Sequence, residues 1–187
     1  MFKELLMNLY VMRHGQTVWN ERGISQGRSQ NRLSKIGKEQ VQERAKEYAH
    51  VKFDIIYASP LMRTMQTANI MNRYHNVNIQ KNNNLIEIDR GTFTGKMFND
   101  LTDDQKILFM KNDEGCKMES YKHLFDRVKI FVNFLKYDCR YDDVLIVTHE
   151  RVASFIEHIL TDTYLDLNDK KTFITYKNAE IKSFKFY

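Results

Sequence analysis

Residues 144–160 read VLIVTHERVASFIEHIL, in which a short apolar run passes through His149 into a pattern of helical length. Val144–Thr148 is continuously hydrophobic, which predicts a strand buried on both faces of a sheet. Arg151–Leu160 follows as a predicted helix. A strand that leads directly into a helix is typical of α/β proteins with a parallel sheet.

The rest of the chain alternates in the same way. Further strands are predicted at Leu6–Met12, at Phe53–Ala58, around Val77–Ile79, at Leu85–Asp89 and, as an edge strand, at Ala179–Phe186. Helices are predicted over Ser34–His50, Leu61–Tyr74, 96–110 and Glu119–Tyr137, with a mobile loop at 111–118. We therefore expect a three-layer α/β sandwich, with a mostly parallel sheet between helices on both faces.

Local signals support the predicted helices. Ser59-Pro60 is typical of an N-cap followed by proline at the first helical position. Apolar residues recur at roughly helical spacing in the helix that starts at Ser34, at Ile36, Val41, Ala45 and Tyr48. The aromatic residues of the long helix, Phe125, Phe131 and Phe134, are expected in the core.

The composition suits one globular domain over residues 1–187. Hydrophobic residues make up 42% of the chain and aromatic residues 12%, which is enough for a core without disulfide or metal staples. Cys116 and Cys139 form no CxxC pattern, so we expect reduced thiols. The apolar run near the N-terminus is interrupted by Asn8 and lacks a signal-peptide cleavage pattern, so we expect a cytoplasmic protein.

The charge favours a small anionic partner. Lys and Arg exceed Asp and Glu by 29 to 24, a formal net charge of +5, and a basic surplus attracts phosphate esters, nucleic acids or acidic lipids. The charges have mixed signs along the chain, with no long block of Lys and Arg. Solubility explains most of this surplus, so we expect neither a nucleic acid nor a membrane as partner. The expected partner is a small phosphorylated substrate, and a homodimer is left open as the assembly.

Polar residues follow three of the predicted strands. In open α/β sheets, ligands bind beyond the carboxyl ends of the strands. That position holds Arg13-His14-Gly15 after the first strand, Ser59–Arg63 after the second, and Thr148-His149 after the apolar run VLIV at 144–147. Two arginines and two histidines are therefore expected to converge at one edge of the sheet, where they would form an anion site.

These residue types suit phosphoryl chemistry. Arginine presents a planar fork that matches phosphate oxygens, as expected for Arg13 and Arg63. A neutral imidazole, here His14 or His149, is a competent nucleophile when a backbone carbonyl orients its second nitrogen. A nearby carboxyl group can protonate the leaving oxygen, and Glu87 is the best-placed candidate. The other four histidines fall within or at the ends of predicted helices and are expected to have surface or packing roles.

Five stretches, in order along the chain, resemble the histidine phosphatase (phosphoglycerate mutase-like) superfamily. They are LYVMRHGQTVWN at Leu9–Asn20, SPLMRTMQTA at Ser59–Ala68, LIEIDRGTFTGK at 85–96, MESYKHLFDRV at 118–128 and VLIVTHE at 144–150. One such stretch alone is weak support for membership of the family. Five stretches in the family's order, which together cover nearly the whole chain, are strong support. The resemblance implies the sandwich fold expected above and a phosphatase that forms a phosphohistidine without a metal or another cofactor.

The resemblance also implies a role for each matching residue. His14 attacks phosphorus, and Glu87 is the acid for the leaving alcohol and then the base for water. Arg13, Arg63 and His149 bind the phosphoryl oxygens, with a further hydrogen bond from Asn20. Gln26 and Gly27 lie in a loop that contacts substrate in relatives. A segment at about 96–118 is expected to be lid-like and, with 26–33, to govern substrate choice.

The sequence departs from the family pattern at three places. Glu150 stands where the family has glycine after its second histidine, and its carboxylate either faces the anion site or turns away at the start of the helix. Met118 occupies a usual glycine position, and 29–34 lacks the usual Asp-x-Pro-Leu. These departures affect substrate choice more than the core chemistry.

Other functions remain as alternatives. A phosphoglycerate mutase-type transfer is less favoured because only 62 positions separate Glu87 from His149, which leaves little room for the cap typical of mutases. A weakly catalytic module that binds phosphorylated ligands would use the same residues. A zinc peptidase is excluded because the residue four positions after His149 is Ala153. The clamp recognises only the phosphoryl group, so the sequence does not rank the esters.

The few glycine and proline residues of the chain gather near the predicted site. The chain has seven glycines and one proline, and five of these eight residues fall in the predicted site: Gly15, Gly27, Pro60, Gly91 and Gly95. Gly23 lies in the adjoining loop. Gly37 and Gly115 lie elsewhere in this interpretation. The clustering indicates a backbone bent around a phosphate pocket.

Overall fold

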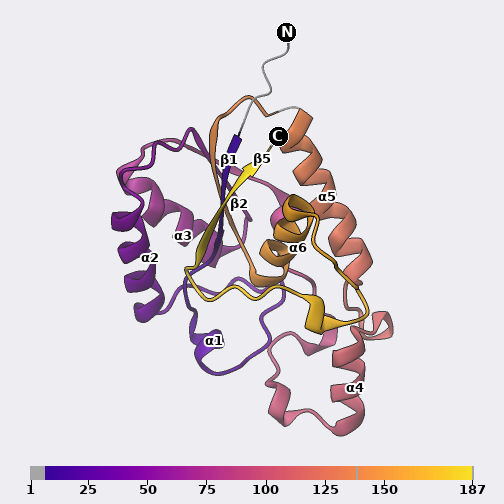
Figure 1. Ribbon diagram of the computed structural model, residues 1–187. Helices are drawn as coiled ribbons and strands as arrows, with labels where there is room; N and C mark the ends of the chain where they lie inside the picture. Colours follow the sequence, from indigo (N-terminus) through magenta and orange to yellow (C-terminus); the bar gives the residue numbers. More distant parts are fainter. Residues whose placement is uncertain (1–6, 138, 187) are drawn as a thin grey trace.

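The computed structural model describes residues 7–137 and 139–186, and a five-stranded sheet lies at its centre (Figure 1). The strands are β1 (Met7–Arg13), β2 (Ile55–Ala58), β3 (Asn78–Lys81), β4 (Asp143–Thr148) and β5 (Ile181–Phe186). Their order is β3-β2-β4-β1-β5, and only β5 runs antiparallel to its neighbour. The expected mostly parallel sheet with an antiparallel edge is confirmed. Leu6, the first residue of the predicted first strand, lies outside the described residues.

The helices cover both faces of this sheet. They are α1 (Val18–Glu21), α2 (Lys35–Glu47), α3 (Met62–Met71), α4 (Asp103–Lys111), α5 (Tyr121–Tyr137) and α6 (Glu150–Thr161). Short 3₁₀ helices lie at 72–74, 83–85, 91–93, 98–100, 114–116 and 170–172. Figure 1 shows α2 and α3 on one side of the sheet and α5 and α6 on the other. The three-layer α/β sandwich is confirmed.

The alternation of side chains along β4 explains why the sheet needs both layers. Val144 and Ile146 pack in the core cluster that contains α5 and α6, whereas Leu145 and Val147 pack in the cluster that contains α2 and α3. All four side chains have no solvent exposure. A strand that is apolar on both faces can be stable only between two layers of helix. Phe131 is buried in the first cluster, as expected, whereas Phe125 and Phe134 are only partly buried and pack against that cluster.

The register of the strands brings their carboxyl ends together. Arg13 pairs with Thr148 and Ala58 with Val147. Beyond the strands, the His14 backbone N–H donates to the Thr148 carbonyl at 2.9 Å, and the Ser59 N–H donates to the Val147 carbonyl at 3.1 Å. Arg13, His14, Ser59 and His149 are therefore held at one edge of the sheet.

Leu85–Asp89 is not a strand, contrary to prediction. Leu85 ends a 3₁₀ helix and the following residues form a loop. Side chains distant in sequence satisfy the carbonyls here: Thr148 Oγ1 donates to Leu85 at 2.8 Å, and Arg127 Nη2 donates to Glu87 at 3.2 Å. With these partners, the segment needs no neighbouring strand.

Three helix details also differ from prediction. The helix predicted at Leu61, with Ser59 as its N-cap, begins at Met62 with Leu61 as its N-cap; the Ser59 hydroxyl is hydrogen-bonded to His149 at 2.8 Å and accepts from the Leu61 N–H at 3.4 Å. The helix predicted over 96–110 is divided, and α4 begins only where Thr102 and Gln105 form a capping box. Ile36 is 52% exposed, and α2 instead buries Gly37, Val41 and Ala45.

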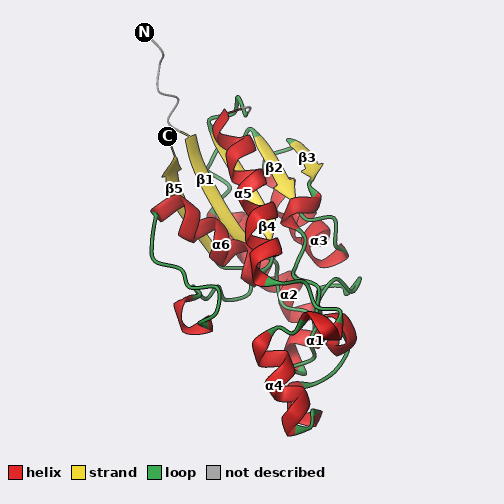
Figure 2. Cartoon of the chain, turned by 90° about the vertical axis from the view of Figure 1, so that its right-hand side faces the viewer, coloured by secondary structure: helices red, strands yellow, loops and turns green. Residues whose placement is uncertain are grey.

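The segment that carries α4 extends beyond the carboxyl edge of the sheet, where Figure 2 shows it below the sandwich, next to α1. It has its own small core, in which Phe93, Leu101 and Met118 are buried against Leu108, Phe109 and Cys116. No helix in the described part of the chain is long and apolar enough to cross a membrane.

Candidate active site

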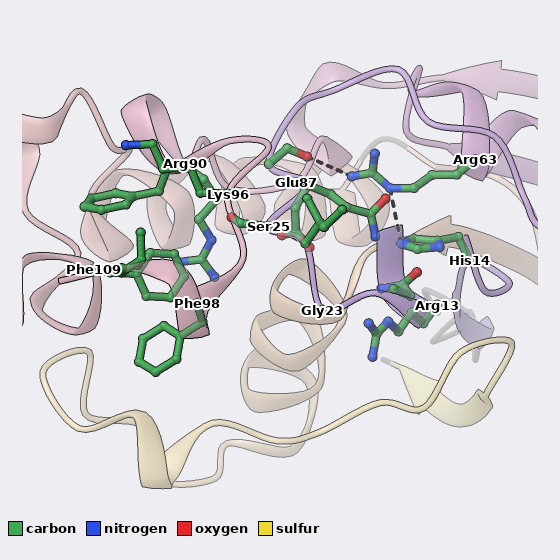
Figure 3. Close-up of a pocket in the computed structure, with 16 residues that line it drawn as sticks. Arg13, His14, Gly23, Ser25, Arg63, Glu87, Arg90, Lys96, Phe98 and Phe109 are labelled. Atoms are coloured by element: carbon green, nitrogen blue, oxygen red, sulfur yellow. Dashed lines mark hydrogen bonds between the residues drawn. The ribbon is translucent and has the colours of Figure 1, made fainter. Parts of the chain in front are cut away.

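Seven of the eight predicted site residues line one open cleft at the carboxyl edge of the sheet: Arg13, His14, Asn20, Gln26, Gly27, Arg63 and Glu87. The eighth, His149, is fully buried. Its ring lies edge-on to that of His14, with 5.2 Å between the ring centres. Figure 3 shows Arg13, His14 and Arg63 gathered at one end of the cleft, and Arg90, Lys96, Phe98 and Phe109 at the other.

His14 has the geometry of a nucleophile. Its Nδ1 lies 2.7 Å from the Gly15 carbonyl oxygen, and since a carbonyl only accepts, Nδ1 carries the proton. Nε2 is then the basic nitrogen, and it accepts from Arg63 Nε at 3.2 Å (Figure 3). Burial, reinforced by the charges of Arg63 and Arg13, lowers the pKa of His14 well below 6.5, so the ring is neutral at neutral pH.

Close backbone packing fixes the loop that carries His14. A Cβ on Gly15 would lie 2.5 Å from the Gly37 carbonyl oxygen, and a Cβ on Gly37 would lie 1.9 Å from the Gln16 carbonyl oxygen. Helix α2 therefore packs directly on the nucleophile loop. Gly37 supports the site, although the sequence interpretation placed it elsewhere.

Arg63 connects the two histidines to the loop at 26–33. Its side chain is 1% exposed, and Nη1 and Nη2 donate to the carbonyls of Ser29 and Gly27, each at 2.8 Å. Burial lowers the pKa of Arg63 to about 10, so it remains charged at neutral pH. The backbone thus uses one hydrogen bond from each terminal nitrogen of the expected fork, and Nε is directed at the two histidines.

His149 is a neutral partner behind the nucleophile. Its Nδ1 accepts from Arg63 Nε at 3.2 Å, and Nε2 lies 2.8 Å from Ser59 Oγ. Since Nδ1 accepts, Nε2 carries the proton and donates to the serine hydroxyl. Burial lowers the pKa of His149 well below 6.5, and the charges of Arg63 and Arg13 act in the same direction.

The two buried histidines make stability depend on pH. Each is neutral when folded but takes up a proton near pH 6.5 when unfolded, so the unfolded state binds more protons below that pH and the free energy of unfolding falls. We expect a loss of up to about 1.4 kcal/mol per histidine per pH unit between about pH 6.5 and about pH 5.

Urea unfolding at about pH 7.5 and about pH 5.5 measures this loss. The variant His14→Gln should lose less stability than the wild type over the same interval, by one histidine's share. Equal losses in the two proteins would show that His14 titrates alike in the folded and unfolded states.

Glu150 forms an ion pair with Arg13. Its Oε2 lies 2.8 Å from Arg13 Nη1, which also donates to the Tyr176 carbonyl at 2.5 Å. The sequence left two orientations open for this carboxylate; in the structure it contacts Arg13 and does not itself line the cleft. Arg13 Nε is buried without a hydrogen-bond partner, so Arg13 has a donor that Glu150 does not use.

Asn20 and Glu87 are positioned by local hydrogen bonds, and Gly27 by its backbone conformation. Asn20 Oδ1 accepts from the Thr17 N–H at 3.1 Å and from Thr17 Oγ1 at 3.0 Å, which leaves its amide nitrogen as a donor in the cleft. Gly27 has φ +46°, and a Cβ there would lie 2.9 Å from Thr94 Oγ1, so the loop requires glycine. Glu87 Oε1 accepts from the Ile88 N–H at 2.9 Å.

A buried ion pair that sequence reasoning did not assign supports the Glu87 loop. Arg127 Nη2 donates to the Glu87 carbonyl at 3.2 Å, and Arg127 Nε donates to Glu119 Oε1 at 2.8 Å. Burial would raise the pKa of Glu119, but hydrogen bonds and charge from Arg127, with help from Arg28, lower it to about 2. Both residues lie in the stretch MESYKHLFDRV, which resembles the family motif but gave no indication of a role for Glu119 or Arg127.

The chemistry open to this arrangement is attack on an electrophilic centre next to an anion. A neutral imidazole, three arginines, one lysine and one carboxylate border the same cleft, with Arg13 and Arg63 at the His14 end. No group of three or more His, Cys, Asp or Glu side chains in the described ranges is arranged to hold a metal ion.

Known proteins resemble this chain in sequence and in fold. The histidine phosphatase superfamily (branch 1) matches residues 9–187. Phosphoserine phosphatase 1 of Hydrogenobacter thermophilus is 30% identical over 77% of this chain and 71% of its own length. The uncharacterized phosphatase PhoE of Bacillus subtilis is 30% identical over 81% and 75%. The crystal structure of the alpha-ribazole phosphatase from Shigella flexneri superimposes with a TM-score of 0.76 at 25% identity, covering 82% of this chain and 79% of that one.

Proposed function

Because the chain belongs to branch 1 of the histidine phosphatase superfamily, it is a phosphatase that works through a phosphohistidine, and we propose that His14 is the nucleophile of a metal-independent phosphomonoesterase for small phosphorylated metabolites. The observation that carries the residue assignment is the pair of bonds on the His14 ring. One nitrogen is fixed by the Gly15 carbonyl, and the other accepts from Arg63 in the cleft.

In the first step, His14 Nε2 attacks phosphorus and the bond from phosphorus to the ester oxygen breaks. Glu87, as a carboxylic acid, gives its proton to that oxygen, so the alcohol leaves neutral. Arg13, the Arg63 Nε–H and the Asn20 amide stabilise the charge on the phosphoryl oxygens. His149 acts through Arg63, since it shares the Nε–H and does not line the cleft.

In the second step, water attacks the phosphorus of the phosphohistidine. Glu87, now a carboxylate, accepts a proton from the water as the bond from phosphorus to Nε2 breaks. Inorganic phosphate leaves, and His14 and Glu87 return to their starting protonation states. The direct test is a panel of phosphate esters compared by kcat/KM. The proposal fails if neither para-nitrophenyl phosphate nor any metabolite ester is hydrolysed.

The segment at 96–118 is proposed as a lid, within one domain over residues 1–187. Phe98, Leu101 and Phe109 from this segment line the cleft, and its separate small core supports movement as a unit. A small phosphorylated substrate, with neither nucleic acid nor membrane as partner, and a cytoplasmic location belong to the same proposal. A homodimer stays a prediction.

Glu150 is expected to weaken the binding of phosphate. Its negative charge offsets the positive charge of Arg13, and its carboxylate occupies Arg13 Nη1. We expect Glu150→Gln to lower the inhibition constant of inorganic phosphate about 10-fold, because the substitution removes a carboxylate that competes with phosphate for Arg13. Steady-state inhibition by phosphate measures it. Asp126→Asn, at an exposed ion pair on α5, is the control and should change nothing. Weaker inhibition by phosphate in Glu150→Gln would show instead that Glu150 orients Arg13.

A further inference from the structure

Arg28 connects the loop at 26–33 to the loop at 87–91, which is called the acid loop below because it carries Glu87. The Arg28 Nε donates to the Glu87 carbonyl at 3.2 Å, and Arg28 Nη1 lies 3.8 Å from Asp89 Oδ2. A guanidinium is planar and rigid. Contacts from two of its nitrogens therefore fix both the distance between the two loops and their relative orientation.

The third nitrogen of Arg28 contacts the buried carboxylate of Glu119. Arg28 Nη2 lies 3.0 Å from Glu119 Oε2, and the Glu119 side chain is 5% exposed. The same oxygen accepts from Arg127 Nη2 at 2.9 Å and from the Asp89 N–H at 3.3 Å. Arg127 Nη2 also donates to the Glu87 carbonyl. Two arginines and one buried carboxylate thus hold the backbone that carries Glu87.

Arg63 holds the backbone on both sides of Arg28. Its Nη2 donates to the Gly27 carbonyl and its Nη1 to the Ser29 carbonyl, each at 2.8 Å. Its Nε donates to His14 Nε2 at 3.2 Å. The backbone beside Arg28 is therefore tied to the nucleophile, while the Arg28 side chain is tied to the acid loop.

A local contact orients Glu87 within the acid loop. Glu87 Oε1 accepts from the Ile88 N–H at 2.9 Å, and Glu87 borders the cleft together with His14 and Arg63 (Figure 3). Burial lowers the pKa of Arg63, and the charge of Glu87 partly opposes this effect. The Glu87 carboxylate thus acts on the guanidinium that contacts His14, but its position relative to His14 depends on where the acid loop is held.

The exposure of Arg28 makes this role separable from folding. Its side chain is 36% exposed, and ion pairs in contact with solvent contribute little to stability. The Arg127 side chain is 9% exposed and also pairs with Glu119. Removing Arg127 would leave a buried charge poorly compensated, whereas removing Arg28 leaves the pair between Arg127 and Glu119 in place.

We infer that Arg28 is a positioning residue that sets the distance between Glu87 and His14. This inference rests on the proposed function. In-line displacement places the attacking nitrogen and the leaving oxygen on opposite sides of phosphorus, so the acid and the nucleophile must be held apart at a fixed separation. With Arg28 in place, the Glu87 proton reaches the ester oxygen as the bond from phosphorus to that oxygen breaks.

Arg28→Met tests the positioning role by comparing two kinds of ester. Methionine keeps an unbranched side chain and removes all the nitrogen donors. We expect kcat for alkyl phosphates to fall about 10- to 100-fold, the scale of the loss when a catalytic group is misplaced by about 1 Å. Phosphorylation of His14 by para-nitrophenyl phosphate, whose leaving group needs no proton, should slow by less than about threefold. Equal losses for the two esters would overturn the inference and leave the proposed function intact.

Two further variants accompany this comparison. Arg44→Met is the matched control, because it also removes an arginine from an ion pair with a glutamate, at the exposed Glu47. It should change neither rate by more than about twofold. Arg28→Lys should recover part of the loss, since an ammonium still pairs with Glu119 but lacks the fork that reaches the acid loop at the same time.

A double-mutant cycle separates the positioning of Glu87 from a direct contact between Arg28 and the substrate. In the Glu87→Gln background, Arg28→Met should lower kcat for alkyl phosphates by less than about twofold, because no acid remains to be positioned. A residue that binds substrate directly would instead raise KM for both esters, and its effect would persist in Glu87→Gln. That second result would overturn the inference.

Hydrogen exchange tests the inference without turnover. In the acid loop, the Asp89 N–H donates to Glu119 Oε2 at 3.3 Å and the Gly91 N–H to Asp89 Oδ1 at 2.8 Å. Exchange of these amides, followed by mass spectrometry, should be about 10-fold faster in Arg28→Met, with exchange in β1 unchanged. Faster exchange supports the positioning of the acid loop even if the wild type hydrolyses no ester. Unchanged exchange in the acid loop would overturn the inference, whether or not the proposed function holds.

Discussion

Replacing His14 with alanine is expected to reduce kcat for every phosphate ester by at least about 10⁴-fold, the scale seen when an enzyme loses its nucleophile. The reason is geometric. Nε2 of His14 is the basic nitrogen of a neutral ring, aimed at the cleft between Arg13 and Arg63. His149 cannot replace it, because it is fully buried and its own nitrogens are engaged by Arg63 and Ser59.

The control for this variant is His50→Ala. His50 is exposed beyond the end of α2, and its contact is with the Glu47 carbonyl, so its loss should leave kcat unchanged. Circular dichroism and the unfolding midpoint of His14→Ala establish that the fold is retained. If His14→Ala kept more than about a tenth of wild-type turnover, the nucleophile assignment would be wrong.

Replacing Glu87 with glutamine is expected to separate the two steps of the reaction. An amide cannot give a proton to a leaving alkoxide, so kcat for alkyl phosphates should fall by about 10²- to 10⁴-fold, the usual contribution of general acid–base catalysis. Nitrophenolate leaves without protonation, so His14 should still be phosphorylated by para-nitrophenyl phosphate. Hydrolysis of the phosphohistidine should then be slow, because water has lost its base.

Rapid-mixing kinetics detect this pattern as a burst. With Glu87→Gln, one nitrophenolate per active site should appear quickly and be followed by a slow steady rate. Glu47→Gln, in an exposed ion pair with Arg44, should behave as wild type. Equal losses for alkyl and nitrophenyl esters, without a burst, would indicate that Glu87 positions the substrate and transfers no proton.

The parts of the fold that the sequence predicted are those set by local pattern. Val144–Thr148 is apolar at every position, and such a run between polar segments has few alternatives to a buried strand. Once that strand and the first one are parallel, the residues after them meet at one edge. The positions of His14 and His149 therefore followed from strand ends, although the contact of each ring did not.

The parts that the sequence did not predict depend on contacts between distant residues. Leu85–Asp89 is apolar enough for a strand, but Thr148 and Arg127 satisfy its carbonyls and a loop results. Gly37 supports the nucleophile loop only because α2 packs against Gln16. No local spacing could indicate either contact.

The electrostatics of the site were predictable only in part. Glu150 was evident as a carboxylate next to an anion site, but its ion pair with Arg13 depends on the first turn of α6. The residues that bind the phosphoryl group do not distinguish one ester from another, and for this reason the sequence ranked no substrate.

The most direct measurement of the central claim is to trap the phosphoenzyme. The wild type is mixed with an ester labelled in its phosphate and quenched in alkali, which preserves phosphohistidine, and the tryptic peptide that spans residues 14–22 is analysed by mass spectrometry. The mechanism predicts up to one phosphate per chain, attached to Nε2 of His14, labile in acid and absent from His14→Ala. Full turnover without a phosphoenzyme, or a label on any other residue, would contradict it.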